Sequence, residues 1–481
     1  MRWATRAAAH AHLIVLRSKG AIVSKDSMSA WRAGLLIVVG AVVLLVPALL
    51  NGFPFVFDDS ADYLVFTPHI YRSPYYGLLL FFFHLNTFIW SAVIIQALIL
   101  SHLIWLWVRI LVIAKGPWIY AACICLLTAF SSLPLMAGYL MADAFTAVMV
   151  LAIGILAFHL QRLNDVEKVY VFLLACVSIV AHVSHLVLSV ALLATVLIVY
   201  VLERRSLSSI RLPVAMVAGP ILLSAAAITL NNAVIHGKPS LSPAGPSFFM
   251  ANLIEYGPAR RYLQEVCPQA GYKLCAKLDE LPDTAFGLLW ATDFYLQLGG
   301  FEAMGDEANS IVRNTIRTRP GEVASLAASL VVRAFLTRAP GAELGPVGNG
   351  FWMESTLEKR FGTATLRSYL ASAQRNRLFP RDLLRRIDFV VFPLSLIFVA
   401  GAAAASAWYA RWERFELCVL AVVGFAANAV LCSITSGVFD RYQARVSWLL
   451  PFTMLLIAMP MFNSLIERGR APATTIKGNW K

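Results

Sequence analysis

Three aspartates stand close together where the first strongly apolar stretch of the chain ends. Asp58, Asp59 and Asp62 lie in the sequence Phe57-Asp-Asp-Ser-Ala-Asp-Tyr63. An ionised carboxylate beside a bilayer is costly without a partner or a task, so the cluster predicts a functional site. The structural alternative is capping, with Asp59 or Ser60 capping a helix and Asp62 in its first turn. Adjacent residues diverge by about 100° on a helix, so Asp58 and Asp59 cannot both face one substrate.

Arg72 and Asp143 are the next charged residues that could share this site. Arg72 stands in Arg72-Ser-Pro-Tyr-Tyr-Gly77, where it could hold a phosphate or diphosphate, or else pair with the nearby aspartates. Asp143 is expected at the start of a later apolar helix, where its carboxylate could serve chemistry or meet the helix dipole. A Mg²⁺ or Mn²⁺ ion between Asp59 and Asp143 is compatible with these oxygen ligands.

Two further pairs have spacings that place both members on one helix face. His182 and His185 are three residues apart, and they could bind metal or phosphate or be hydrogen-bonded core groups. Arg441 and Arg445 are four residues apart just before the last apolar stretch, a spacing that lets two guanidinium groups grip one phosphate. Snorkelling of both arginines to lipid headgroups is the alternative.

The elements that must position these groups are membrane helices. With 59% hydrophobic and 14% charged residues, the composition argues against a soluble fold and for an all-α polytopic membrane protein. Many apolar stretches approach the ~20 residues needed to cross a bilayer. We expect ten spans, at about 33–50, 89–112, 118–135, 142–160, 169–184, 186–202, 213–230, 389–409, 416–433 and 446–463.

The basic residues give these spans an orientation. With the N-terminus in the cytoplasm, the inside segments carry 19 Lys or Arg, and the short outside loops carry only Arg72, Arg441 and Arg445. This obeys the positive-inside rule, so the net charge of +13 is mostly a topology signal and no nucleic-acid partner is expected. Both termini are then cytoplasmic and the candidate site faces outward. Residues 1–27 lack a cleavage site, so we expect no removed signal peptide, and Met28 is an alternative start.

The chain divides into tails, membrane modules and one long outside segment. We expect cytoplasmic tails at 1–32 and 464–481, a seven-helix module at 33–230 with an outer loop at 51–88, an outside domain at 231–388, and three helices at 389–463. The outside segment reads as mostly helical, and residues 322–337 are apolar enough to lie on a bilayer surface.

Cysteine usage fits an outside location for residues 231–388. Cys267 and Cys275 lie there, close enough to bridge across a turn. A disulfide between them implies an oxidising compartment such as a bacterial periplasm, and two unpaired thiols are the alternative. The other five cysteines fall in expected spans and should simply pack there.

The order of these motifs resembles the GT-C superfamily of integral-membrane glycosyltransferases, in particular protein mannosyltransferases and lipid A aminoarabinose transferases. The similarity covers about 33–230 and depends on Phe57–Tyr63, Arg72–Gly77 and Tyr139-Leu-Met-Ala-Asp143. The sequence departs from the family in having Asp-Asp where many relatives have Asp-Glu, and Arg-Ser-Pro where many have Lys-Pro-Pro. Residues 231–388 have no counterpart there.

The resemblance implies a sugar donor linked to polyprenyl phosphate, with the catalytic base at Asp58 or Asp59 and a second acidic position at Asp143. Sugar transfer needs a base on the acceptor hydroxyl and stabilisation of the departing phosphate. Arg72, Arg441 and Arg445 are expected to hold the phosphate, with His182 or His185 assisting. The acceptor would be an envelope glycan, lipid or protein at the bacterial inner membrane.

Two other classes of function remain open from the sequence. A transporter or flippase of a lipid-linked or anionic substrate would also have many spans, but it usually carries ionisable groups near the bilayer midplane. Here the expected spans are nearly free of charge and the polar residues gather at one face, which favours an enzyme. The third class is a non-catalytic assembly partner that docks through 231–388.

Overall fold

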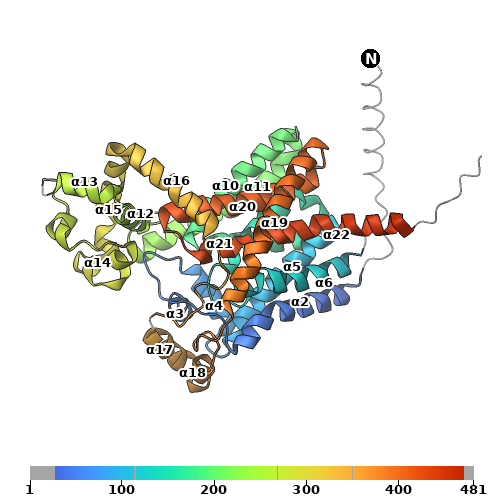
Figure 1. The fold of residues 1–481 in the computed structure, drawn as a ribbon, viewed down its shortest axis with the longest axis horizontal. Helices are drawn as coiled ribbons and strands as arrows, with labels where there is room; N and C mark the ends of the chain where they lie inside the picture. Colours follow the sequence, from blue (N-terminus) through green and yellow to red (C-terminus); the bar gives the residue numbers. More distant parts are fainter. Residues whose placement is uncertain (1–27, 113–114, 268, 349, 471–481) are drawn as a thin grey trace, which may run out of the picture.

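The computed structural model describes residues 28–112, 115–267, 269–348 and 350–470. Within these ranges the fold is all-helical and contains no strand (Figure 1). Seven helices are long and apolar enough to cross a membrane, so the chain is a helical membrane protein. They are α2 (Ala30–Asn51), α5 (Trp90–Leu111), α10 (Val183–Leu202), α11 (Leu207–His236), α19 (Arg381–Trp408), α20 (Trp412–Thr435) and the run Asp440–Met461, which joins α21 (Asp440–Ser447) to α22 (Leu449–Arg470).

Three of the ten expected spans correspond to shorter helices, so ten spans are not confirmed. They are α6 (Gly116–Phe130), α8 (Ala144–Phe158) and α9 (Asp165–Val180). The first outer loop also contains a short apolar helix, α4 (Tyr75–His84), which begins directly after Pro74. At 1.5 Å per residue the 15 residues of α8 extend only about 22 Å, less than a hydrocarbon core of about 30 Å.

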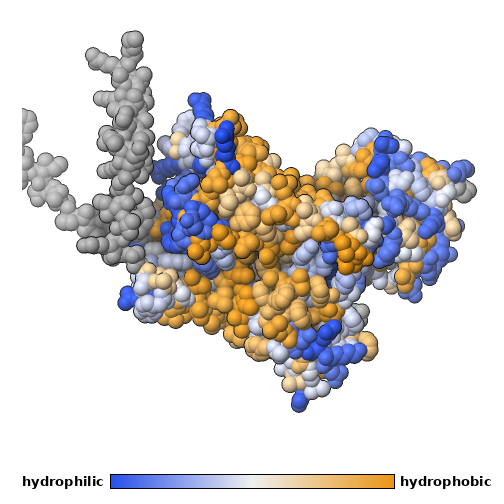
Figure 2. All heavy atoms as spheres, turned by 180° about the vertical axis from the view of Figure 1, so that it is seen from behind, coloured by the Kyte–Doolittle hydropathy of each residue, from blue (hydrophilic) through white to orange (hydrophobic). Residues whose placement is uncertain are grey.

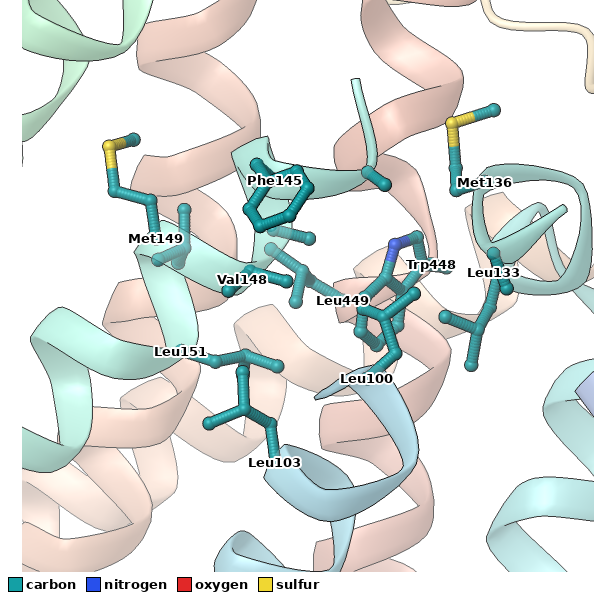
Figure 3. Close-up of a cluster of buried hydrophobic side chains, with 14 of the residues drawn as sticks. Leu100, Leu103, Leu133, Met136, Phe145, Val148, Met149, Leu151, Trp448 and Leu449 are labelled. Atoms are coloured by element: carbon teal, nitrogen blue, oxygen red, sulfur yellow. The ribbon is translucent and has the colours of Figure 1, made fainter. Parts of the chain in front are cut away.

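Helix α8 can be short because protein surrounds it. Every residue from Ala144 to Ala157 is buried. Figure 3 shows Phe145, Val148, Met149 and Leu151 of α8 packed among side chains of α5, α7 (Leu133–Ala137) and the Trp448–Leu449 region. A helix with no lipid-facing side does not have to match the bilayer thickness, and α8 therefore forms the centre of the membrane module.

The surface distribution of apolar side chains agrees with a membrane position. Figure 2 shows apolar residues gathered over the middle of the molecule and hydrophilic residues over its ends and its two protruding units. Side chains such as Leu222 and Phe389 are 69% and 76% exposed. Such large exposed apolar surface is expected where lipid rather than water is the neighbour.

The turn between the expected spans 169–184 and 186–202 is present. α9 ends at Val180 and α10 begins at Val183. His182 between them has an extended backbone and accepts a hydrogen bond at Nδ1 from the backbone N–H of Ser184, which caps α10. Residues 169–202 therefore form two helices rather than one.

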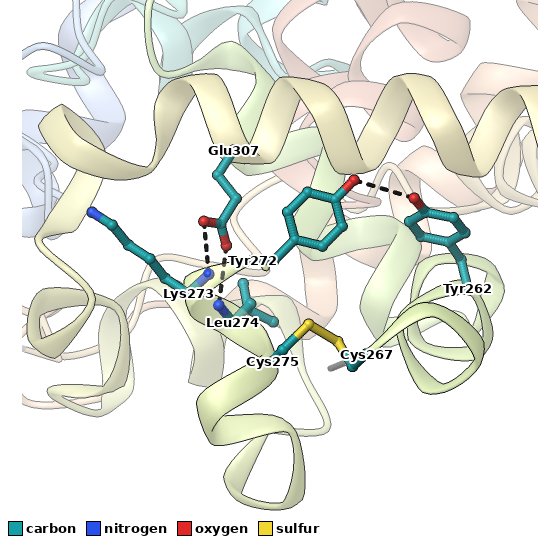
Figure 4. Close-up of a disulfide and its surroundings, with 7 residues drawn as sticks. All are labelled: Tyr262, Cys267, Tyr272, Lys273, Leu274, Cys275 and Glu307. Atoms are coloured by element: carbon teal, nitrogen blue, oxygen red, sulfur yellow. Dashed lines mark hydrogen bonds between the residues drawn. A yellow bond between two sulfur atoms is a disulfide. The ribbon is translucent and has the colours of Figure 1, made fainter. Parts of the chain in front are cut away.

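A helical unit with its own hydrophobic core follows α11 and lies at the left of Figure 1. It consists of α12 (Gly245–Glu255), α13 (Pro258–Val266), η2 (Lys273–Glu280), η3 (Gly287–Ala291), α14 (Phe294–Gln297) and α15 (Gly300–Thr318). A disulfide joins Cys267 and Cys275, and beside it Glu307 accepts the backbone N–H groups of Lys273 and Leu274 (Figure 4).

Residues 231–388 contribute to two separate hydrophobic cores, that of the helical unit and that of the membrane module. α16 (Pro320–Leu336) packs along α20 and leaves Leu336 73% exposed, in line with a helix at the bilayer surface. After α16, the loop 339–348 and the helices α17 (Gly350–Phe361) and α18 (Thr363–Leu370) pack on the membrane module, since Leu344, Leu357 and Tyr369 belong to its core. This second part covers the first outer loop.

Candidate functional site

The first outer loop is fixed beside the start of α8 by its backbone. Gly52 has φ +79°, a left-handed conformation that glycine adopts without strain, and it turns the chain after α2. Phe55 then forms an isolated parallel bridge: its N–H donates to Gly138 O at 2.8 Å, and its carbonyl accepts from Leu140 N at 2.9 Å. The acidic loop therefore lies next to the segment that leads to Asp143.

Asp59 and Asp62 both bind Arg72. Arg72 Nη2 donates to Asp59 Oδ1 at 2.6 Å, and Nη1 donates to Asp62 Oδ2 at 2.7 Å. The guanidinium lies over the Tyr63 ring, 4.8 Å from its centroid. Neither Asp59 nor Ser60 makes a side-chain capping bond to α3 (Ser60–Val65), although Asp62 does lie in its first turn. The aspartates therefore face an arginine rather than cap a helix.

Asp58 points away from Asp59, as neighbours on a chain must. A Cβ placed on Gly348 would lie 3.3 Å from Asp58 Oδ1, so Asp58 faces the loop 339–348. Asp59, the other predicted catalytic acid, lies between Arg72 and Arg441.

Arg441 connects the far end of the chain to this loop. Its Nη1 lies 3.7 Å from Asp59 Oδ2 and its Nε lies 3.4 Å from Glu343 Oε2. The guanidinium stacks over the Phe57 ring at 4.1 Å, a cation–π contact that fixes its position. Arg441 Nε and Nη1 are buried, yet neither has a hydrogen-bond partner among the described residues. Arg441 therefore keeps donor capacity directed into the site.

Asp143 and Arg445 form a buried ion pair next to Arg441. Arg445 Nη1 lies 3.4 Å from Asp143 Oδ1, and the two residues are 1% and 4% exposed. Arg445 also donates to Asn428 Oδ1 through Nη2 at 2.7 Å and to Ser184 Oγ at 3.4 Å. Its donors are thus engaged by α8, α10 and α20, which makes Arg445 a structural bridge. We call Asp59, Asp62, Arg72, Asp143, Glu343, Arg441 and Arg445 the arginine–aspartate cluster.

The two predicted histidines have different surroundings. His185 is fully buried, with Nδ1 2.7 Å from Ser178 O and Nε2 2.7 Å from Thr146 Oγ1. Both ring nitrogens are therefore used inside the protein, and His185 is a core residue rather than a ligand. His182 is half-buried and its Nδ1 caps α10, but it lies within electrostatic reach of Arg445, Arg441 and Arg72.

Glu343 is a site residue that the sequence did not reveal. It lies in the Gly/Pro-rich loop 339–348, where neither periodicity nor a motif marks it. Burial raises the pKa of the Glu343 carboxyl, and the Arg441 guanidinium only partly offsets this. Its Oε2 has no hydrogen-bond partner among the described residues. A carboxyl with a raised pKa and an open oxygen is suited to proton transfer.

The pKa of the Asp62 carboxyl is shifted in the opposite direction to that of Glu343. Burial alone would raise the pKa of this carboxyl, but His69, Arg72 and the Trp352 indole together lower it. Trp352 Nε1 donates to Asp62 Oδ1 at 3.0 Å, and His69 Nε2 lies 3.7 Å from Asp62 Oδ2. Asp62 is therefore an ionised anchor that joins α17 to the first outer loop.

The described residues contain no group of three His, Cys, Asp or Glu that could hold a metal ion. Asp59 and Asp143 each face a guanidinium group instead of one another. A metal between them remains a prediction. A cavity of about 10 Å³, room for about one water molecule, lies beside the cluster and is lined by Tyr139, Glu343 and Arg441 among others.

Comparison of the chain with protein-family models, curated proteins and solved structures finds no match.

Proposed function

We propose that the protein is a glycosyltransferase that moves a sugar from a polyprenyl-phosphate carrier to an acceptor in the bacterial cell envelope. In this proposal it has a GT-C-like architecture in the inner membrane, with ten crossings made by the seven long helices and α6, α8 and α9. Both termini are cytoplasmic, and the arginine–aspartate cluster faces the periplasm. The supporting observation is the contact of Asp59 with both Arg72 and Arg441, residues that come from opposite ends of the chain.

The arginines suit an anionic leaving group. The buried Nε and Nη1 of Arg441 have no hydrogen-bond partner among the described residues, and an unsatisfied buried donor gains most from a charged acceptor. A lipid phosphate is such an acceptor at a membrane surface.

We assign two roles to two different carboxyl groups: one positions the arginines, and the other accepts the proton of the acceptor hydroxyl. Asp59 Oδ1 lies 2.6 Å from Arg72 Nη2 and Oδ2 lies 3.7 Å from Arg441 Nη1, so this carboxylate stands between the two guanidinium groups. Glu343 combines an unpartnered oxygen with a place on the cavity wall beside Arg441. We therefore assign the positioning of the arginines to Asp59 and the acceptance of the hydroxyl proton to Glu343. Asp58, on the other side of the loop, is the alternative base.

The site must open for its substrates. A cavity of about 10 Å³ is far smaller than the several hundred Å³ of a ligand pocket. The loop 339–348 covers the cluster through Glu343 and through the bond from Ala339 N to Asp440 Oδ1. Withdrawal of this loop would expose Arg441 next to the apolar surface along which a lipid carrier can approach, and its return would bring Glu343 back beside Arg441.

The experiment is sugar transfer or release from a polyprenyl-phosphate-linked sugar, assayed with purified protein in detergent. Asp58→Asn, Asp59→Asn and Glu343→Gln are compared with Asp306→Asn, which changes an almost fully exposed carboxylate of α15. The proposal requires turnover by the wild type and an unchanged rate in Asp306→Asn. It also requires a loss of about 100-fold or more in the variant that removes the base, which is Glu343→Gln or, in the alternative, Asp58→Asn. Absence of turnover together with substrate uptake into proteoliposomes would instead establish a transporter.

A further inference from the structure

A second group of buried charged residues lies at the opposite ends of the same membrane helices. His159 follows α8, Glu203 follows α10, and Glu416 lies near the start of α20. Arg205, just after α10, donates through Nε to Glu203 Oε2 and through Nη2 to Glu416 Oε1. The side chains of His159, Glu203 and Glu416 are only 2%, 3% and 1% exposed. We call these four residues the glutamate–histidine cluster.

The hydrogen bonding of this cluster is incomplete. Glu203 Oε1, Glu416 Oε2 and His159 Nε2 are buried without a hydrogen-bond partner among the described residues. His159 Nε2 lies 4.0 Å from Glu416 Oε2, too far for a hydrogen bond and close enough for electrostatic interaction. A buried polar atom without a partner is costly, and three of them on residues joined by one arginine and one ion pair indicate a missing ligand.

The charge count identifies that ligand. Two carboxylates share one guanidinium, and the other charged groups on the rim, Arg162 and Glu413, bind each other. With both glutamates ionised, one negative charge is left uncompensated among buried side chains, an arrangement that is strongly unfavourable. A proton is small enough to cancel this charge without a cavity. Arg205 and Arg162 already supply positive charge here, so the proton resides on a carboxyl group rather than on His159.

We propose that Glu203 and Glu416 share one proton, so that the glutamate–histidine cluster is a proton-binding site at the end of the helices remote from the arginine–aspartate cluster. The proton lets one carboxyl donate to the other and removes the excess charge. Its loss leaves two carboxylates that repel each other where α8, α10 and α20 meet. The inference is independent of the proposed function, because proton binding can be measured without a substrate.

The protonated state can be tested with the full chain in detergent. Glu416→Gln replaces the shared acid by a neutral amide of the same shape, and Glu203→Gln does the same at its partner. Asp306→Asn is the control, since the Asp306 side chain on α15 is 99% exposed and takes no part in the cluster. Infrared spectroscopy at neutral pH should detect a carboxylic-acid band in the wild type and Asp306→Asn that is absent from Glu416→Gln and Glu203→Gln.

The pH dependence of thermal unfolding is the second readout. The folded protein holds one more proton than the unfolded chain above about pH 5, so its stability should fall as the pH rises from about 5 to about 9. The expected slope is roughly 1–3 °C per pH unit in the wild type, and it should flatten in Glu416→Gln and Glu203→Gln.

Three results would overturn the proposal. The first is a wild type without a carboxylic-acid band. The second is a band, or a pH slope, that survives in both glutamine variants of the cluster. The third is stabilisation by NaCl or KCl at fixed pH without any dependence on pH, which would assign the site to a metal cation. If Glu416→Gln does not fold, Glu203→Gln decides, because the two residues hold the same proton.

Discussion

The arginine–aspartate cluster and the glutamate–histidine cluster tie together the same three helices at their two ends. At one end Arg445 joins Asp143 before α8 to Ser184 of α10 and Asn428 of α20. At the other end Arg205 joins residues that follow α10 and lie in α20, beside His159 after α8. The two clusters differ in which of their buried polar atoms lack a hydrogen-bond partner among the described residues.

Open donors remain in the arginine–aspartate cluster, and open acceptors dominate the glutamate–histidine cluster. Among the residues that the structure describes, Arg441 Nε and Nη1 lack hydrogen-bond partners in the arginine–aspartate cluster. In the glutamate–histidine cluster the same is true of Glu203 Oε1 and Glu416 Oε2. Unused donors beside a membrane surface suit an anion, whereas unused carboxylate oxygens suit a proton. The same scaffold thus offers two sites of opposite chemistry, about one short helix apart.

Substitution of Arg445 should give the largest change in stability. Arg445→Gln leaves Asp143 as a buried, unpaired charge, and we expect a loss of about 3–5 kcal/mol in unfolding free energy. Denaturant unfolding in detergent measures it. Glu416→Gln is the comparison from the other end and should cost far less, because it imitates a state that the site already holds. Equal losses of unfolding free energy in the two variants would contradict the claim that the clusters differ in this way.

Substitution of Arg441 should separate activity from stability. Arg441→Gln removes the donors assigned to the phosphate, and turnover should fall about 10²–10³-fold, the usual cost of one lost donor to a developing anion. The unfolding temperature should hardly change, because the Arg441 side chain makes fewer internal hydrogen bonds than that of Arg445. Exposed Arg317 on α15 supplies the control Arg317→Gln. A large drop in unfolding temperature for Arg441→Gln would make it a second structural bridge.

Removal of the disulfide tests the unit beside the first cluster. The double variant Cys267→Ser, Cys275→Ser opens a loop closed over a separation of 8 residues, worth about 2–3 kcal/mol in the chain-entropy model. The loss of stability should be confined to α13 and η2, and it should appear as faster hydrogen exchange of the backbone amides of these segments. Unchanged exchange there would indicate that the core of this unit, rather than the crosslink, holds the segments.

Acid should loosen the first outer loop, whereas base should loosen the second cluster. The pKa of Asp62 is lowered in the folded protein, so its contribution to stability is present above the ordinary aspartate value of about 4 and is lost as the pH falls below it. The effect should be small, and protease accessibility of the first outer loop between about pH 3 and pH 6 can follow it. Asp62→Asn should remove it, and persistence of the acid effect in that variant would assign it to another carboxyl.

Hydropathy and charge bias were sufficient to predict a helical membrane protein, because long apolar stretches have few other stable environments. The buried helix α8 shows the limit of this reasoning: it is apolar on all sides, and its 15 residues do not reveal whether lipid or protein surrounds them.

The candidate site was predictable only in part. The positions of Asp59, Asp143 and Arg441 at helix ends indicated that they could meet. Nothing in the sequence separates the roles of Arg441 and Arg445, because both stand just before the last expected span, yet Arg445 forms a buried ion pair with Asp143 and Arg441 keeps unpartnered donors. His185 has the pattern of a ligand and the contacts of a core residue. Glu343 lies in a loop without a motif. The two glutamates and the histidine of the second cluster lie at the ends of three different helices, which only the fold brings together.

The most direct test of the account is a double-mutant cycle between Asp59 and Arg441 in the turnover of a polyprenyl-phosphate-linked sugar. If Asp59 positions Arg441 for the leaving phosphate, Asp59→Asn combined with Arg441→Gln should be little worse than either variant alone, with a coupling energy of about 1 kcal/mol or more. Independent, additive losses, or a wild type that does not turn the donor over, would contradict it.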